Sequence, residues 1–240
     1  MKILLLNGSP RKNSNTMVIT EAFIRGLLRK ENSEVKRYDL SDCDIRPCLG
    51  CYSCWGKNAG KCVINDDMSD IRQDILLSDI IIESFPLYFF GMPSQMKAFT
   101  DRLLPFTMQY VGGDNFHELR YNELFSKKLV VISSCGYSEA DEMYLALKKQ
   151  YDMICGEGGY TSIFSGEGEI LGLGTKRPQM RYYLGNIEKA GEEFAEKLSL
   201  SEETKTILNE PIVPKALFEA VARAHWSEFR NDENKKPLGV

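Results

Sequence analysis

The sequence predicts an α/β protein with a doubly wound, five-stranded parallel sheet in the order 2-1-3-4-5 and a helical C-terminal extension. Short, nearly continuous apolar segments alternate with amphipathic ones, as in repeated strand–helix units. The apolar segments suit strands that are covered by helices on both faces. The most distinctive residues follow these segments, where sheets of this kind bind their ligands.

Composition and charge narrow the possible functions. The chain has 240 residues, of which 43% are hydrophobic and 27% charged, with a net charge of −4 and no Lys/Arg cluster. This argues against a nucleic-acid partner. No apolar run is long enough for a membrane span or a signal-peptide core, so we expect a cytoplasmic protein that does not bind membranes. We expect one domain over residues 1–199 and a helical extension over 200–240.

The first strand–loop–helix unit carries an anion-site pattern. Residues 2–7 are apolar, residues 16–30 are amphipathic, and the loop between them opens with a single glycine. Such a loop directs free backbone N–H groups and the positive end of a helix dipole at one point. Its side chains suit a monophosphate, although a capped surface turn remains the alternative. The candidate ligands are Ser9, Arg11, Ser14, Asn15 and Thr16.

A cysteine-rich segment follows a second, shorter strand at residues 34–40. Its spacing is C-x2-C-x2-C-x7-C, and nearby glycines let the backbone curl so that the sulfur atoms can face one centre. Four thiolates suit a [4Fe–4S] cluster or a tetrahedral zinc ion, and the lack of two separated C-x2-C pairs favours iron–sulfur. A compact turn with reduced, buried thiols is the alternative. The candidate ligands are Cys48, Cys51, Cys54 and Cys62.

An aromatic loop follows the third strand. A capped helix is expected over residues 66–78, the strand over 79–84 and another helix over 94–104. An apolar loop at the carboxyl end of a strand can cover a flat ligand, or its rings can complete the core. The candidate residues are Pro86, Leu87, Tyr88, Phe89 and Gly91.

The fourth and fifth strands complete the sheet. They are expected over residues 128–134 and 160–167, with helices over 139–153 and 181–198. Cys135 and Gly136 follow the fourth strand in a short polar turn. The extension should contain a short helix capped by Ser201 and a helix over 215–229. That last helix is expected to have an apolar face of Leu217, Val221, Ala224 and Phe229, and Phe218 and Trp226 are expected to dock on the core or a partner.

The loops together indicate a flavin nucleotide. In the order 2-1-3-4-5, the winding reverses between the first and third strands, which precede the phosphate-type loop and the aromatic loop. A monophosphate beside a flat conjugated ring system describes FMN, with residues 135–137 near the polar edge of the ring.

Three segments also resemble a known family. The runs KILLLNGSPRKNSNT, FPLYFFGMPSQMKAFTDR and PCLGCYSCWGKNAGKCVINDDM are similar to NAD(P)H-dependent FMN reductases of flavodoxin-like fold, in the branch that includes the iron–sulfur flavoproteins. The resemblance implies that the first loop holds the FMN phosphate, that the aromatic loop holds the isoalloxazine, and that Cys135 and Gly136 contribute. It also implies a homodimer or a dimer of dimers paired across the helix at 94–104. Members of the family differ in whether the cysteine loop holds a four-iron cluster.

These features predict an FMN-dependent NAD(P)H oxidoreductase. FMN would carry the chemistry, so no catalytic side chain is expected. Electrons would pass by ping-pong hydride transfer to a flavin, a quinone, a nitro compound or a similar acceptor. The alternative is an iron–sulfur flavoprotein that carries electrons between a ferredoxin-like partner and FMN. A redox sensor acting through its thiols is a third interpretation.

Overall fold

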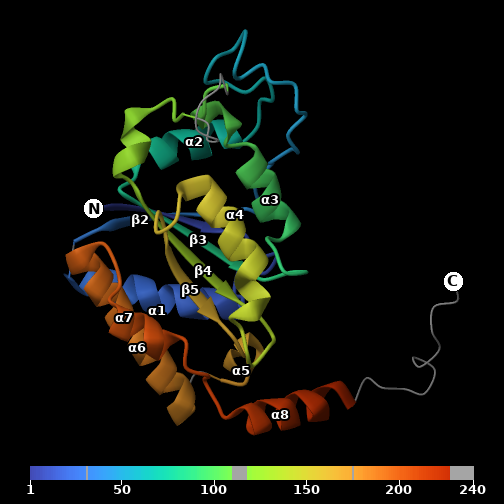
Figure 1. Cartoon of the computed structure of the whole chain (residues 1–240), viewed down its shortest axis with the longest axis vertical. Helices are drawn as coiled ribbons and strands as arrows, with labels where there is room; N and C mark the ends of the chain where they lie inside the picture. The colour runs from blue at the N-terminus through green and yellow to red at the C-terminus, as the bar shows by residue number, and fades with distance from the viewer. Residues whose placement is uncertain (31, 110–117, 175, 228–240) are drawn as a thin grey trace, which may run out of the picture.

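The central sheet has the predicted topology. The computed structural model describes residues 1–30, 32–109, 118–174 and 176–227. Five parallel strands pair in the order β2-β1-β3-β4-β5, which confirms the prediction (Figure 1). The strands are β1 (Lys2–Asn7), β2 (Glu34–Asp39), β3 (Ile80–Pro86), β4 (Lys128–Ser134) and β5 (Thr161–Ser165).

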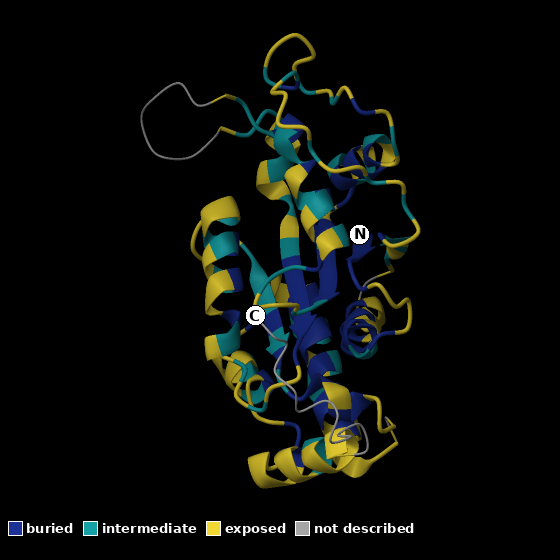
Figure 2. Ribbon diagram, turned by 90° about the vertical axis from the view of Figure 1, so that its right-hand side faces the viewer, coloured by how far each residue is buried: buried dark blue, intermediate teal, exposed yellow. Residues whose placement is uncertain are grey.

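Helices cover both faces of the sheet and give two hydrophobic cores. One face carries α1 (Asn15–Lys30) and α6 (Pro178–Lys197), and the other carries α2 (Met68–Leu77), α3 (Ser94–Asp101) and α4 (Leu145–Cys155). Figure 2 shows the central strands and the inner helix faces as buried. Within the described residues, no helix is both long enough and apolar enough to cross a lipid bilayer.

Two glycines allow α1 and α6 to pack with their backbones close together. A Cβ atom on Gly26 would lie 1.9 Å from the carbonyl oxygen of Glu188, and one on Gly191 would lie 2.1 Å from that of Phe23. Any larger residue would push the helices apart. This contact fixes the position of α1, whose N-terminus forms part of the candidate site.

Several helix ends differ from the predicted ones. The helix expected over residues 94–104 ends at Asp101, and a 3₁₀ turn, Leu104–Phe106, follows it. Pro105 explains the change, because it has no N–H to donate to the carbonyl oxygen of Asp101 four residues earlier. The helix expected over 139–153 begins as a 3₁₀ turn and then becomes α4, Leu145–Cys155. The last strand, expected over residues 160–167, spans only Thr161–Ser165, and α5 (Gly168–Leu171) follows it.

The C-terminal extension packs onto the core of the sheet domain. Ser201 caps α7 (Glu202–Leu208) by accepting a hydrogen bond from the backbone N–H of Thr204. Helix α8 (Lys215–Ser227) buries Phe218 in the same cluster as α6, as predicted. The predicted apolar face is not the face that this helix buries, because Leu217 is 48% exposed. Trp226 is also half exposed, and residues 228–229 lie outside the described part of the chain.

Candidate functional site

The loop between β1 and α1 is held by its own side chains. The backbone N–H of Gly8 donates to the carbonyl oxygen of Ser84 at 2.8 Å, which ties the loop to β3. Ser9 Oγ accepts from the N–H of Arg11 at 3.2 Å, and Ser14 Oγ caps α1 by accepting from Met17 at 3.2 Å. Both hydroxyls act as acceptors, so each O–H can still donate to a ligand.

Free donors converge where this loop meets α1. From Lys12 to Thr16, no backbone N–H donates to any acceptor within the described chain. The first turn of α1 contains no acidic side chain. Arg11 is exposed, and its guanidinium pairs with none of the described residues, whereas Lys12 pairs with Asp42. Free N–H groups, the helix dipole and a free guanidinium are features that suit an anion.

Two of the predicted ligands face away from the open side of this loop. Thr16 is 1% exposed, and its hydroxyl lies 2.6 Å from Ser134 Oγ at the end of β4. One turn later, Thr20 makes the equivalent contact with Ser84 of β3 at 2.7 Å. Asn15 is half buried, and its amide lies beside Gly172. Thr16 therefore fastens α1 to the sheet, and its backbone N–H is the part that remains available to an anion.

The aromatic loop forms a tight turn in an unusual conformation. Tyr88 and Gly91 exchange two backbone hydrogen bonds of 3.0 Å, so Phe89 and Phe90 are the central residues. Both have positive φ angles, 50° and 64°, which bulky residues rarely adopt. Phe89 is 100% exposed. The turn therefore holds aromatic rings in solvent at a cost in backbone strain, which is a feature of ligand and interaction sites.

The loop after β4 closes the third side of the site. The N–H of Leu87 donates to the carbonyl oxygen of Ser134 at 2.9 Å, which places the two loops side by side. Phe90 stacks on Tyr137 with ring centroids 6.4 Å apart. Cys135 is buried, and burial raises the pKa of its thiol, which therefore stays protonated at neutral pH. Gly136 lies against Glu169, which a Cβ atom would approach at 3.1 Å.

The three predicted flavin-site loops therefore meet at one edge of the sheet. The register pairs Asn7 with Ser84 and Pro86 with Ser134, so β1, β3 and β4 end next to one another. This is the edge and the reversal point at which doubly wound sheets bind ligands. One end offers anion donors and the other offers exposed aromatic faces.

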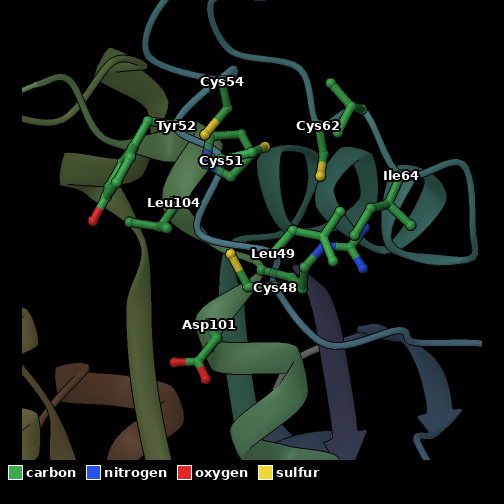
Figure 3. Close-up of a pocket in the computed structure, with 12 residues that line it drawn as sticks. Cys48, Leu49, Cys51, Tyr52, Cys54, Cys62, Ile64, Asp101 and Leu104 are labelled. Carbon is green, nitrogen blue, oxygen red and sulfur yellow. The ribbon is translucent and has the colours of Figure 1, made fainter.

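The four predicted metal-ligand cysteines lie around a second, separate pocket. Figure 3 shows Cys48, Cys51, Cys54 and Cys62 surrounding one space, with Leu49, Ile64 and Leu104 as apolar walls. Burial raises the pKa of Cys54, and charge on any of the other three thiols would raise it further. Within the described residues, no three Cys, His, Asp or Glu side chains lie close enough to bind a single metal ion.

A buried ion pair clamps both ends of the cysteine loop. Arg102, at the C-terminal end of α3, donates to the two carboxylate oxygens of Asp66 at 2.7 and 2.8 Å and to the carbonyl oxygen of Arg46 at 2.6 Å. Burial opposes the charge of Arg102, but Asp66 and Cys62 raise the pKa of this guanidinium above its ordinary value. Nε of Arg102 is buried without a hydrogen-bond partner. Since Arg102 lines the cysteine pocket, this donor belongs to the pocket wall.

A second buried arginine lies close to Cys62. Arg72 of α2 is 8% exposed, and its Nη1 has no hydrogen-bond partner. None of the ion pairs formed by the described residues includes Arg72. Burial lowers its pKa, and charge on Cys62 is the strongest influence in the opposite direction. A buried cation without a counter-charge is costly and indicates that an anion belongs nearby.

Sequence reasoning missed the residues that support the two sites. Ser134, which contacts both Thr16 and Leu87, belongs to an apolar strand and carries no motif. The sequence did contain one indication that Arg72 is buried. It lies four residues after Met68 and three before Ile75, on the buried face of α2. A cation on an apolar helix face next to a cysteine motif is the pattern that could have revealed it.

Sequence comparisons find relatives among the iron–sulfur flavoproteins. An iron–sulfur flavoprotein from Archaeoglobus fulgidus is 38% identical over 108 residues, which are 44% of this chain and 47% of that protein. Another, from Methanocaldococcus jannaschii, is 34% identical over 118 residues, or 47% of this chain and 60% of that protein. The matches thus span about half the length of these curated relatives.

Solved structures share the fold. An FMN-dependent NADH-azoreductase from Bacillus anthracis, solved in complex with FMN, aligns with a TM-score of 0.56 and 18% identity, covering 82% of this chain and 98% of that one. An NAD(P)H:quinone oxidoreductase from Methanothermobacter marburgensis aligns with a TM-score of 0.57 and 18% identity over 81% and 96% of the two chains. The NADPH-dependent FMN reductase family matches residues 1–156. The chain therefore belongs to the NADPH-dependent FMN reductase family.

Proposed function

We propose that this protein is an FMN-dependent NAD(P)H oxidoreductase that reduces a small, flat acceptor such as a flavin, a quinone, an azo or a nitro compound. The observation that carries the proposal is that the loop with free N–H groups at 12–16 and the exposed aromatic turn at 88–91 follow strands that end side by side. When bound, FMN would supply the electron and hydride transfer chemistry. Family membership and the fold shared with FMN-dependent reductases support this assignment.

The residues of the site fit FMN by their chemistry. The N–H groups from Lys12 to Thr16, the hydroxyls of Ser9 and Ser14, and Arg11 suit the phosphate. The aromatic turn from Tyr88 to Gly91, with the exposed ring of Phe89, and the adjacent Pro86 and Leu87 suit a flat ring system. Cys135 and Gly136 lie on the β4 side of it. The buried Cys135 thiol is suited to lining the site as a protonated group rather than as a nucleophile.

The activity is tested by rapid anaerobic mixing. Protein loaded with FMN is mixed with NADH or with NADPH, and absorbance near the flavin band is followed. We expect bleaching with at least one nicotinamide and recovery when a quinone is added. Absence of bleaching with both nicotinamides would overturn the proposed activity. The same protein run on a sizing column tests the homodimer or dimer of dimers that we propose to pair across α3.

A second candidate function rests on the cysteine pocket. Four thiols around one space, with the unpartnered Nε–H of Arg102 in its wall and the buried Arg72 near Cys62, support an anionic group bound by thiolates. A [4Fe–4S] cluster fits this donor set, because each thiolate binds a different iron and the sulfurs stand farther apart than around a single ion. With such a cluster, the protein would exchange single electrons with a ferredoxin-like partner. Iron and sulfide analysis of protein purified without oxygen tests this candidate.

A further inference from the structure

The charge balance around the cysteine pocket points to a role for a residue that binds neither iron nor flavin. Arg102 and Asp66 neutralise each other through a two-point ion pair. Asp101, an acidic residue that lines the pocket, pairs with Lys97. Arg72 is therefore left as a buried positive charge. Asp66 also favours the charged form of Arg72, but its carboxylate is already paired with Arg102.

We propose that Arg72, assisted by the Nε–H of Arg102, supplies the counter-charge for a thiolate-ligated iron–sulfur cluster in the pocket of Cys48, Cys51, Cys54 and Cys62. The inference rests on the second candidate function above. Four thiolates outweigh the positive charge of an iron–sulfur core, so the loaded pocket is anionic. Arg72 is then a positioning residue: it stabilises the bound cluster, and it favours the reduced form because that form carries one more negative charge.

The unpaired charge of Arg72 should also lower the stability of the metal-free protein. In metal-free protein, Arg72 is a buried cation that lacks a partner, and such groups destabilise the folded state. Arg72→Met keeps most of the side-chain length and removes the charge. We expect this variant to raise the Tm of the metal-free protein while weakening the cluster. A residue that mattered only for packing would change both in the same direction.

The test compares four proteins, reconstituted with ferrous iron and sulfide under anaerobic conditions. These are the parent, Arg72→Met, Arg72→Lys and, as the matched control, Lys61→Met, which removes an exposed charge next to Cys62. The measurements are iron per chain, the rate of iron loss to a chelator and the reduction potential by titration with electron paramagnetic resonance. For Arg72→Met we expect iron loss at least about tenfold faster, in the range seen for second-layer changes at metal sites. Its potential should be more negative, with Arg72→Lys and Lys61→Met close to the parent.

The possible outcomes distinguish the role of Arg72 from the cluster assignment and from the oxidoreductase activity. If Arg72→Met holds iron as firmly as the parent and at the same potential, Arg72 is not the counter-charge and the cluster assignment stands. Equal effects in Arg72→Met and Lys61→Met would also overturn the inference, because any nearby charge would then serve. If the parent takes up no iron, the cluster and its counter-charge fail together. FMN binding, measured in the same samples, reports on the oxidoreductase independently.

Discussion

Arg11 is the residue on which phosphate recognition should depend most. Its guanidinium is exposed and unpaired among the described residues, so it is free to form a two-point contact with phosphate. We expect Arg11→Ala to weaken FMN by about 2 kcal/mol, or about thirtyfold, and to leave riboflavin affinity unchanged. Lys12→Ala is the matched control, because Lys12 already pairs with Asp42. Quenching of flavin fluorescence measures the affinity of the parent and both variants for FMN and for riboflavin. An equal loss for riboflavin in Arg11→Ala would place the phosphate elsewhere.

Glu83 predicts a pH dependence of stability. This carboxyl group is buried on β3, where it accepts a hydrogen bond from Tyr151, and burial raises its pKa to about 7. The folded state therefore holds the proton more tightly than the unfolded state, whose pKa is the ordinary 4.5. The contribution of Glu83 to the stability of the folded state is therefore complete below pH 4.5 and is lost as the pH rises to 7.

Glu83→Gln should remove that dependence. Glutamine can accept the same hydrogen bond and does not titrate. The stability of the variant relative to the parent should rise by up to about 3 kcal/mol between pH 4.5 and pH 8. Urea unfolding at several pH values measures the difference, in which the titrations shared by both proteins cancel. A difference that stays flat across this range would show that Glu83 is ionised in the folded state.

At the level of single residues, the sequence could predict which chemical groups a loop offers, but it could not predict where each side chain points. It indicated a phosphate loop because hydroxyls, an arginine and an opening glycine follow an apolar strand. It could not indicate that the Thr16 side chain turns toward Ser134, because that contact joins residues 118 positions apart. Arg72 was missed for a related reason. Its lack of a partner is a property of the folded environment and not of the local sequence.

Among the structural elements, the turn from Tyr88 to Gly91 is the clearest place where stability and function compete. Two-residue hairpin loops with positive φ at both positions favour Asn-Gly, but here Phe89 and Phe90 occupy them. We expect Phe89→Asn to stabilise the protein by about 1 kcal/mol, because asparagine tolerates this conformation and the fully exposed ring buries nothing in the core. FMN affinity should fall because a ring face is lost.

The control for this variant is Phe125→Asn. Phe125 is 72% exposed and lies in a 3₁₀ helix without positive φ, so neither stability nor flavin affinity should change appreciably. Thermal unfolding and a flavin titration test both variants. If Phe89→Asn is stabilised and still binds FMN like the parent, the strain at this turn does not serve the flavin.

Element types and their order were predictable, whereas element ends and the orientation of the last helix were not. The strand order follows from loop chemistry combined with the rules for doubly wound sheets. Helix α8 was assigned the wrong face because it packs through Phe218 near its start and leaves Leu217 half exposed. An amphipathic pattern fixes the face of a helix only when a whole side of it is covered, and this helix is largely exposed (Figure 2).

At the level of the whole molecule, the two candidate sites lie at opposite ends of α3. The helix starts just after the aromatic loop and runs toward the cysteine loop, whose pocket includes Asp101 at its last turn (Figure 1). Eight residues of helix span about 12 Å. Each site has its own walls and charges. We therefore expect the flavin chemistry to proceed without iron on the thiols.

This separation gives the last prediction. We expect replacement of Cys48, Cys51, Cys54 and Cys62 together by Ser to leave the rate of flavin bleaching by NAD(P)H within about tenfold of the parent, a change of at most ~1.4 kcal/mol in the barrier. The physical reason is that the nicotinamide needs to approach only the exposed side of the aromatic turn, at the far end of α3 from these thiols. Cys43→Ser controls for the loss of a thiol outside the pocket. Two results together would reverse the assignment. In the parent, the flavin would bleach with neither nicotinamide but rapidly with a reduced ferredoxin, and in the four-serine variant the response to ferredoxin would be lost. Electrons would then enter through the cysteine pocket and pass along α3, and the protein would be the cluster-bearing carrier.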